Sequence, residues 1–169
     1  LAVAHIEPEF AREMMRGVLA QQAQDGGGCF SYFPNTDRPT NRDPHRSDDT
    51  VWQVYTVKAL IAETGDWSFL DEVIPFRDGG EATVYDHILI GLKHINERRG
   101  PHGLPTLFYA DWNDSLAMFD DVDAESVMLA EQLVYSCKEF VELADRRGCD
   151  ADATWCRDAA AELTAVCNG

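Results

Sequence analysis

Two short polar clusters hold the side chains of this 169-residue chain that are best suited to chemistry. One reads Asp111-Trp112-Asn113-Asp114, and the other places Asp48 and Asp49 directly after Ser47. An indole offers a flat apolar face that can pack on a sugar ring, and amide and carboxylate groups can bind its hydroxyls. A carboxyl group held against an indole loses part of its hydration, which raises its pKa. The clusters therefore suit general-acid chemistry on a hydroxylated substrate.

Both clusters also fit purely structural roles. Asp and Asn form Asx turns and cap helices, so spacing alone slightly favours a turn for the 111–114 cluster. Acidic residues are stabilised at helix N-termini, which suits Asp49 and, less well, Asp48. Two adjacent acids point in different directions, so we expect one of the two to face the loop end. His102 can bind a substrate hydroxyl, and a role in a turn suits it equally well.

The other residue patterns predict neither a metal site nor a cofactor. The five cysteines include no C-x-x-C pair, so reduced thiols are favoured over a disulfide framework or a zinc site. The run Gly26-Gly27-Gly28 lacks the lysine and the strand of a phosphate-binding loop. The acids Asp120, Asp121 and Asp123 lack the twelve-residue pattern of a calcium loop.

The elements that must position these clusters are helical. Apolar residues recur at helical spacing in five segments, which predicts helices over about residues 7–24, 49–64, 84–99, 125–147 and 153–166. No segment shows sustained alternation of apolar and polar residues, so we predict an all-α fold. Expected boundary residues are Pro8 in a first turn, Ser47 or Asp48 and Thr83 as N-caps, and Gly65 and Gly148 as helix ends.

The connections between these helices predict where the two clusters lie. Loops longer than about 12–15 residues in a compact domain are usually functional or disordered, and aromatic residues in these loops favour function. If successive helices alternate in direction, the first and third long loops emerge at the same end. We therefore expect residues 47–49 and 111–114 to share one face of the molecule.

Composition limits the classes of partner. The chain carries 30 acidic and 14 basic residues, a net charge of −16, which argues against binding to nucleic acid or to an anionic membrane surface. No apolar run approaches the roughly 20 residues of a membrane-spanning helix. The length and the 45% hydrophobic content suit one soluble globular domain.

Four strings, in this order and at the expected spacing, give the chain a specific resemblance. They look like motifs of the family-94 glycoside phosphorylases, which include cellobiose, cellodextrin and chitobiose phosphorylases and a domain of cyclic β-1,2-glucan synthase. The similarity extends from about residue 2 to residue 148. The strings are Ser47-Asp48-Asp49-x-x-Trp52, the segment 63–76 that begins Glu63-Thr64-Gly65-Asp66-Trp67, Gly100-Pro101-His102-Gly103-Leu104-Pro105, and Ala110-Asp111-Trp112-Asn113-Asp114.

The resemblance implies a fold and a reaction. Residues 1–169 would form part of an (α/α)6 barrel. The reaction would be reversible phosphorolysis of a β-linked sugar with inversion, with inorganic phosphate as co-substrate and no cofactor. Asp114 matches the general acid of the family, Trp112 matches its donor-sugar site, and Asp111 and Asn113 would shape the loop. Asp48, Asp49 and His102 complete the candidate substrate-binding residues. The whole enzyme would be a cytoplasmic homodimer.

The chain also departs from the family pattern. Five predicted helices fall short of the twelve in the barrel, and an upstream Arg/Asp motif, downstream phosphate-binding elements and an N-terminal β-domain do not appear. We therefore expect a fragment that does not catalyse phosphorolysis by itself. Two alternatives stay open: an inverting (α/α)6 glycoside hydrolase, which needs a second carboxylate as base, and a non-catalytic α-helical carbohydrate-binding or scaffold module.

Overall fold

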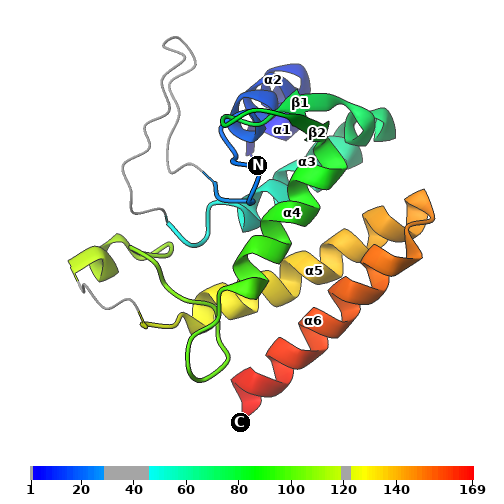
Figure 1. Ribbon diagram of the computed structural model, residues 1–169. Helices are drawn as coiled ribbons and strands as arrows, with labels where there is room; N and C mark the ends of the chain where they lie inside the picture. The colour runs from blue at the N-terminus through cyan, green and yellow to red at the C-terminus, as the bar shows by residue number, and fades with distance from the viewer. Residues whose placement is uncertain (1, 29–45, 119–122) are drawn as a thin grey trace.

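The computed structural model describes residues 2–28, 46–118 and 123–169, and these are predominantly helical (Figure 1). The expectations for Cys29, Asp120 and Asp121 lie outside the described residues. The helices are α1 (Ala2–Ile6), α2 (Pro8–Leu19), α3 (Val51–Thr64), α4 (Val84–Glu97), α5 (Val127–Arg147) and α6 (Asp150–Asn168). Two short 3-10 turns, η1 (Trp67–Asp71) and η2 (Asp114–Met118), and a hairpin of β1 (Val73–Pro75) and β2 (Glu81–Thr83) complete the elements.

The all-α prediction is confirmed, with two additions. The N-terminal segment forms a separate short helix, α1, before Pro8 begins α2. The antiparallel hairpin pairs Val73 with Thr83 and Pro75 with Glu81. Each of its strands has only three residues, so neither is long enough to produce the alternating pattern by which a strand is recognised in sequence.

Most of the expected helix boundaries hold. The Thr83 side chain accepts a hydrogen bond from the backbone N–H of Asp86, and so caps α4. Gly65 and Gly148 adopt left-handed conformations, with φ of 68° and 71°, at the ends of α3 and α5. The prediction that Ser47 or Asp48 caps α3 is wrong.

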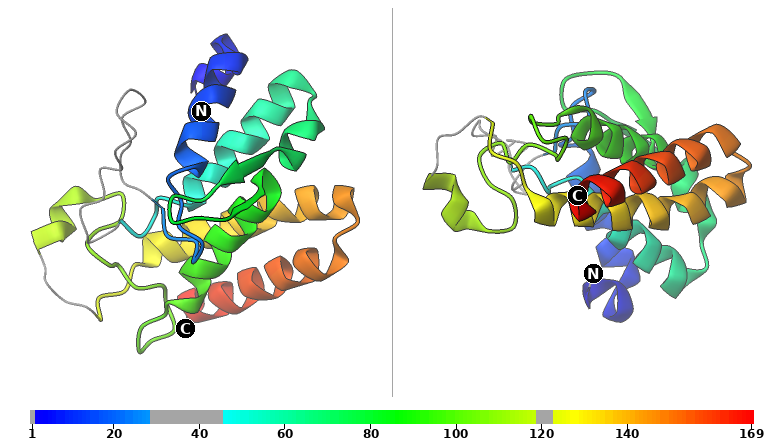
Figure 2. Two further views of the ribbon diagram at one scale, coloured as in Figure 1. Left: turned by 45° about the horizontal axis from the view of Figure 1, so that its top comes forward. Right: turned by 90° about the horizontal axis from the view of Figure 1, so that it is seen from below.

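Helix α5 is the centre of the hydrophobic core. It runs antiparallel to α6 along its length, and it also packs against α3 and α4 (Figure 2). Leu129, Leu133 and Phe140 on α5 are fully buried, as is Leu163 on α6. The ring of Tyr85 on α4 lies 4.8 Å from that of Phe140, centroid to centroid. None of the helices in the described ranges is long and apolar enough to cross a membrane.

The chain that leaves α2 is docked on α4. The Gln22 amide nitrogen donates to the carbonyl oxygen of His87 at 3.0 Å, and Nδ1 of His94 lies 2.6 Å from the carbonyl oxygen of Asp25. The backbone approaches so closely that a Cβ on Gly26 would lie 2.6 Å from the carbonyl oxygen of Ile90. His87 and His94 are thus buried where this segment packs on α4.

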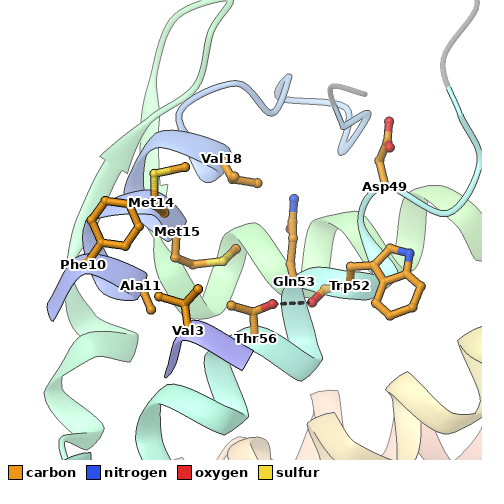
Figure 3. A pocket seen from close by; sticks show the side chains of 10 residues that line it. All are labelled: Val3, Phe10, Ala11, Met14, Met15, Val18, Asp49, Trp52, Gln53 and Thr56. Carbon is orange, nitrogen blue, oxygen red and sulfur yellow. Dashed lines mark hydrogen bonds between the residues drawn. The ribbon is translucent and has the colours of Figure 1, made fainter. Parts of the chain in front are cut away.

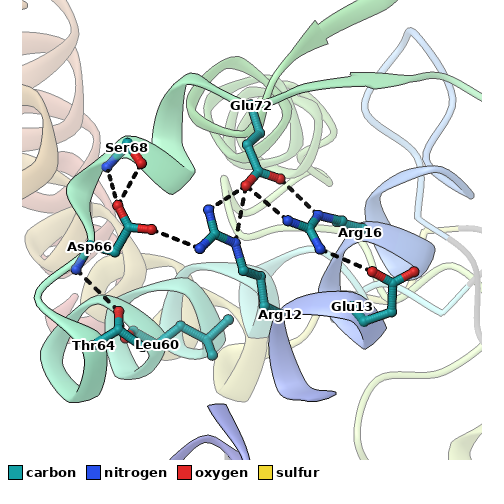
Figure 4. Close-up of polar contacts among 8 residues, drawn as sticks. All are labelled: Arg12, Glu13, Arg16, Leu60, Thr64, Asp66, Ser68 and Glu72. Carbon is teal, nitrogen blue, oxygen red and sulfur yellow. Dashed lines mark hydrogen bonds and ion pairs between the residues drawn. The ribbon is translucent and has the colours of Figure 1, made fainter. Parts of the chain in front are cut away.

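A half-buried charge network joins α2 to the turn after η1 (Figure 4). Both Arg12 and Arg16 donate hydrogen bonds to the Glu72 carboxylate, and Arg12 also pairs with Asp66 at 2.7 Å. The hydrogen bonds from Arg16 and Arg12 hold the pKa of Glu72 below its ordinary value, despite partial burial. The network fixes α2 against the hairpin and thereby fixes the start of the chain that leads toward the 46–52 segment.

We predict that Glu72→Gln destabilises the fold by about 1–3 kcal/mol, because it removes the charge of the carboxylate that both Arg12 and Arg16 contact. Urea unfolding at pH 7 measures the change. Glu13→Gln is the matched control, since the Glu13 side chain is 73% exposed and pairs with Arg16 across one turn. That control should cost no more than about 0.5 kcal/mol, and equal losses for the two variants would contradict the prediction.

Candidate active site

The segment before α3 and the loop before α5 are joined by backbone contacts. Arg46 forms isolated β-bridges with Phe108 and Ala110. The N–H of Ser47 donates to the carbonyl oxygen of Ala110 at 2.9 Å, and the Ser47 hydroxyl donates to the same oxygen at 3.3 Å. The prediction that the two polar clusters share one face is confirmed. These bonds also explain why Ser47 does not cap α3.

Two tryptophans form an aromatic shelf where the segments meet. Trp112 is 68% exposed, and its ring centroid lies 5.3 Å from that of Trp52 at an interplanar angle of 48°. The indole N–H of Trp52 donates to Oδ2 of Asp48 at 2.9 Å. Asp48 is itself only 3% exposed, so it holds Trp52 in place beneath Trp112 rather than lining the surface. The carboxyl group that lies against an indole is therefore that of Asp48.

Asp111 and Asn113 shape the loop, as the resemblance implied. Asp111 is buried, and its carboxylate accepts a hydrogen bond from the Ser126 hydroxyl at 2.6 Å and from the N–H of Asn113 at 2.8 Å. Oδ1 of Asn113 accepts from the N–H of Ser115 at 3.2 Å. These are Asx turns, and the bond to Ser126 also ties the loop to the start of α5, where Ser126 is the N-cap. Both residues thus set the direction in which Trp112 and Asp114 project.

Asp114 begins the turn η2 and extends into solvent. Its side chain is 75% exposed, and its Oδ1 forms an ion pair with a guanidinium nitrogen of Arg46. Arg46 itself is 13% exposed in its side chain, and its guanidinium carbon lies 6.0 Å from the centroid of the Tyr109 ring. An exposed carboxylate is thus held by a largely buried cation. Arg46 is a candidate functional residue that the sequence patterns did not predict. The signal was a cation placed directly before Ser47-Asp48-Asp49 in a strongly acidic chain.

The two adjacent acids point to different surroundings, as expected. Asp49 lines a cavity of about 370 Å³ between α2 and α3, whose other walls include Phe10, Met15 and Gln53 (Figure 3). Oδ2 of Asp49 and Oε1 of Gln53 are buried, and neither has a hydrogen-bond partner in the part of the chain that the structure describes. Burial, and next the charge of Asp48, raise the pKa of Asp49 to about 7, although Arg46 opposes the shift. Burial also raises the pKa of Asp48.

His102 is not brought to the aromatic shelf by any contact among the described residues. Its side chain is 80% exposed, and its Nδ1 lies 2.6 Å from Oε2 of Glu125. Glu125 also accepts from the backbone N–H groups of His102 and Leu104, each at 3.0 Å. His102 therefore lies in a turn that is held by Glu125, the residue directly before the N-cap Ser126. Within residues 2–28, 46–118 and 123–169, no three His, Cys, Asp or Glu side chains gather as metal ligands.

Comparison with known proteins gives one family. The model of the glycosyl hydrolase 94 superfamily, catalytic domain, matches residues 1–169. The chain is 30% identical to an N,N'-diacetylchitobiose phosphorylase of Vibrio proteolyticus over 190 aligned positions, which cover 99% of this chain and 23% of the relative.

Other relatives are named for different sugars. A solabiose phosphorylase of Paenibacillus borealis is 36% identical over 85% of this chain and 18% of its own length. A cyclic beta-(1,2)-glucan synthase of Rhizobium meliloti is 28% identical over 83% of this chain and 6% of its own length. The chain thus spans about a fifth of the length of the phosphorylases that it matches.

The buried carboxyl of Asp49 leads to a testable pH dependence. Its pKa in the folded chain, about 7, exceeds its ordinary value of 3.8, so the folded state keeps a proton that the unfolded state has lost between these pH values. This group's contribution to stability is therefore lost as the pH rises from about 4 to 7. Asp49→Asn should remove that loss. Between pH 5 and pH 8, the free energy of unfolding of the variant should therefore rise by about 2–3 kcal/mol relative to that of the unsubstituted protein.

Urea unfolding at pH 5 and pH 8 measures this difference. Asp158→Asn, at an exposed position on α6, is the control and should keep the original pH dependence. If Asp49→Asn keeps that dependence too, Asp49 is ionised across the whole range.

Proposed function

The chain belongs to the glycosyl hydrolase 94 superfamily as part of its catalytic domain, and from that premise we propose that the whole protein is an inverting β-glycoside phosphorylase. It takes a β-linked disaccharide or oligosaccharide and inorganic phosphate, and it yields an α-glycosyl 1-phosphate and a sugar shortened by one unit. Phosphorylases among its relatives, such as those named for N,N'-diacetylchitobiose and solabiose, support this reaction class.

The observation that carries the proposal is the pairing of an exposed acid with an exposed indole on one fixed loop. Trp112 and Asp114 are two residues apart, and both project into solvent from a loop whose backbone is held by Asp111 and Asn113. In the proposed reaction, the ring of the donor sugar packs on Trp112. The carboxyl of Asp114 then lies within reach of the glycosidic oxygen that must leave.

The chemistry needs one catalytic carboxyl from this loop. A phosphate oxygen attacks the anomeric carbon, the bond from that carbon to the glycosidic oxygen breaks, and the electron pair goes to the leaving oxygen. Asp114 donates the proton that this oxygen requires. Phosphate is already an anionic nucleophile, so the second carboxylate that an inverting hydrolase uses to activate water is not needed.

The remaining candidates have supporting roles in this proposal. Asp48 keeps Trp52 beneath Trp112, because the indole N–H of Trp52 is bonded to its carboxylate. We further propose that Asp49 and His102 contact substrate hydroxyls, that the reaction uses no cofactor, and that the whole protein is a cytoplasmic homodimer. The relatives' names differ in their sugars, so cellobiose is one candidate substrate among several β-linked disaccharides.

We predict that cleavage by the whole protein requires phosphate. Incubation with cellobiose or N,N'-diacetylchitobiose should release a sugar 1-phosphate in proportion to added phosphate, and it should release no free donor sugar when phosphate is omitted. Ion chromatography of both products measures this. Equal cleavage in phosphate-free buffer would instead identify a hydrolase, which needs a second carboxylate as base.

We predict that Asp114→Asn in the whole protein lowers the phosphorolysis rate by about 10²–10⁴-fold, because asparagine cannot supply the proton. The thermal unfolding midpoint should stay close to the original, since the side chain is 75% exposed. Asp158→Asn, which removes one exposed carboxylate far along the sequence on α6, is the control and should retain full activity. Undiminished turnover by Asp114→Asn would show that Asp114 is not the general acid, and would favour a non-catalytic sugar-binding or scaffold role for this part of the protein.

A further inference from the structure

Arg46 is built into the scaffold more firmly than the acid that it contacts. Its backbone bridges to Phe108 and Ala110 on the neighbouring loop. Its side chain is 13% exposed and lies over the Tyr109 ring, whereas the side chain of Asp114 is 75% exposed. In this ion pair the cation is the fixed member. The direction of the carboxylate therefore depends on the guanidinium group rather than the reverse.

The electrostatic environment of Arg46 also supports its role as the fixed member of the ion pair. Its positive charge acts to lower the pKa of both Asp48 and Asp49, so it lies within electrostatic reach of both buried acids. A guanidinium group keeps its charge at every physiological pH and offers donors in a rigid fork. Arg46 thus keeps its charge whatever the protonation states of the neighbouring carboxyl groups.

We propose that Arg46 is a positioning residue for proton donation by Asp114. This inference rests on the proposed function, in which Asp114 is the general acid. Arg46 holds Oδ1 of Asp114 and thereby directs Oδ2, the oxygen from which the proton is donated, toward the glycosidic oxygen. As the proton passes to the leaving oxygen, negative charge develops on the carboxylate beside the guanidinium group. The attraction between the two is then stronger in the transition state than before it, which accelerates this step.

Such a role differs from binding substrate. Loss of Arg46 should lower the rate of reactions whose leaving group needs a proton. It should leave the rate nearly unchanged for reactions whose leaving group does not need one. A sugar alcohol needs the proton, whereas 2,4-dinitrophenolate leaves as a stable anion. The two leaving groups therefore separate a residue that acts through Asp114 from one that acts on the donor sugar, on phosphate or on the fold.

The experiment compares Arg46→Met, Arg46→Lys and Asp114→Asn in the whole protein. Phosphorolysis is measured with whichever of cellobiose and N,N'-diacetylchitobiose the protein turns over, and with the 2,4-dinitrophenyl β-glycoside of the same donor sugar. Arg46→Met should lower kcat on the disaccharide about 10–100-fold and change that on the dinitrophenyl glycoside less than about threefold. The KM for phosphate should stay within about twofold. Arg46→Lys, which keeps the charge without the fork, should recover part of the lost rate.

Arg157→Met is the matched control. It also removes an arginine from an ion pair, with Asp145, and leaves residues 46–114 unchanged, so both substrates should react at the original rates. Thermal unfolding midpoints of all variants identify any that are misfolded. If Arg46→Met does not fold, the comparison of Arg46→Lys on the two substrates carries the test.

The failures of the two proposals are distinguishable. If the unsubstituted protein shows no phosphate-dependent cleavage, the proposed function itself is wrong. If Asp114→Asn retains full activity on the disaccharide, Asp114 is not the general acid. If Asp114→Asn is impaired on the disaccharide alone but Arg46→Met slows both substrates equally, Arg46 acts through the fold or the donor sugar. A large increase in the KM for phosphate would show that Arg46 binds phosphate instead, and full activity of Arg46→Met would exclude any positioning role.

Discussion

The hydrogen bonds of Ser47 to the carbonyl oxygen of Ala110 join two segments that are 63 residues apart in sequence. The arrangement of the candidate site depends on this connection. It places Arg46 opposite Asp114 on one side and Trp52 beneath Trp112 on the other. Without it, the start of α3 and the loop before α5 would each carry polar side chains with no defined relation to each other.

The connection is supported by packing on both sides. Helix α5 is buried against α3, α4 and α6, and Ser126 at its N-cap binds the carboxylate of Asp111. The chain after α2 is held on α4 through Gln22 and His94, and α2 is held by the ion pairs of Glu72. Rigid helices therefore supply the orientation, and the loops between them supply the groups that can do chemistry.

The site combines acids in different environments. Asp48 is buried and Asp49 is half-buried at the start of α3, and burial raises the pKa of each. Asp114 remains exposed, and the adjacent guanidinium group of Arg46 is largely buried. A helix N-terminus favours negative charge nearby, which helps this part of the chain to hold several carboxyl groups together. In the proposed reaction only the exposed acid transfers a proton, and Asp48 holds Trp52 against Trp112.

The sequence by itself determined the helices, most of their boundaries and the family. Apolar periodicity, Thr83 as a cap and the glycines at 65 and 148 are local signals, and local hydrogen bonding and backbone preference decide them. It also placed the two clusters on one face, since alternating helix directions limit where loops can emerge. Three-residue strands left no such signal, so the β1–β2 hairpin was missed.

Only the tertiary structure decided what each polar side chain does. Ser47 was available as a cap, but the carbonyl of Ala110, brought close by packing, bound it instead. Asp48 came to accept a hydrogen bond from an indole N–H, Asp49 came to lie beside a cavity, and Arg46 came to pair with Asp114. Apart from Trp52, which is four residues from Asp48, the partners of these side chains are distant in sequence. Their hydrogen bonds and ion pairs depend on distances of a few ångströms, which spacing along the chain does not specify.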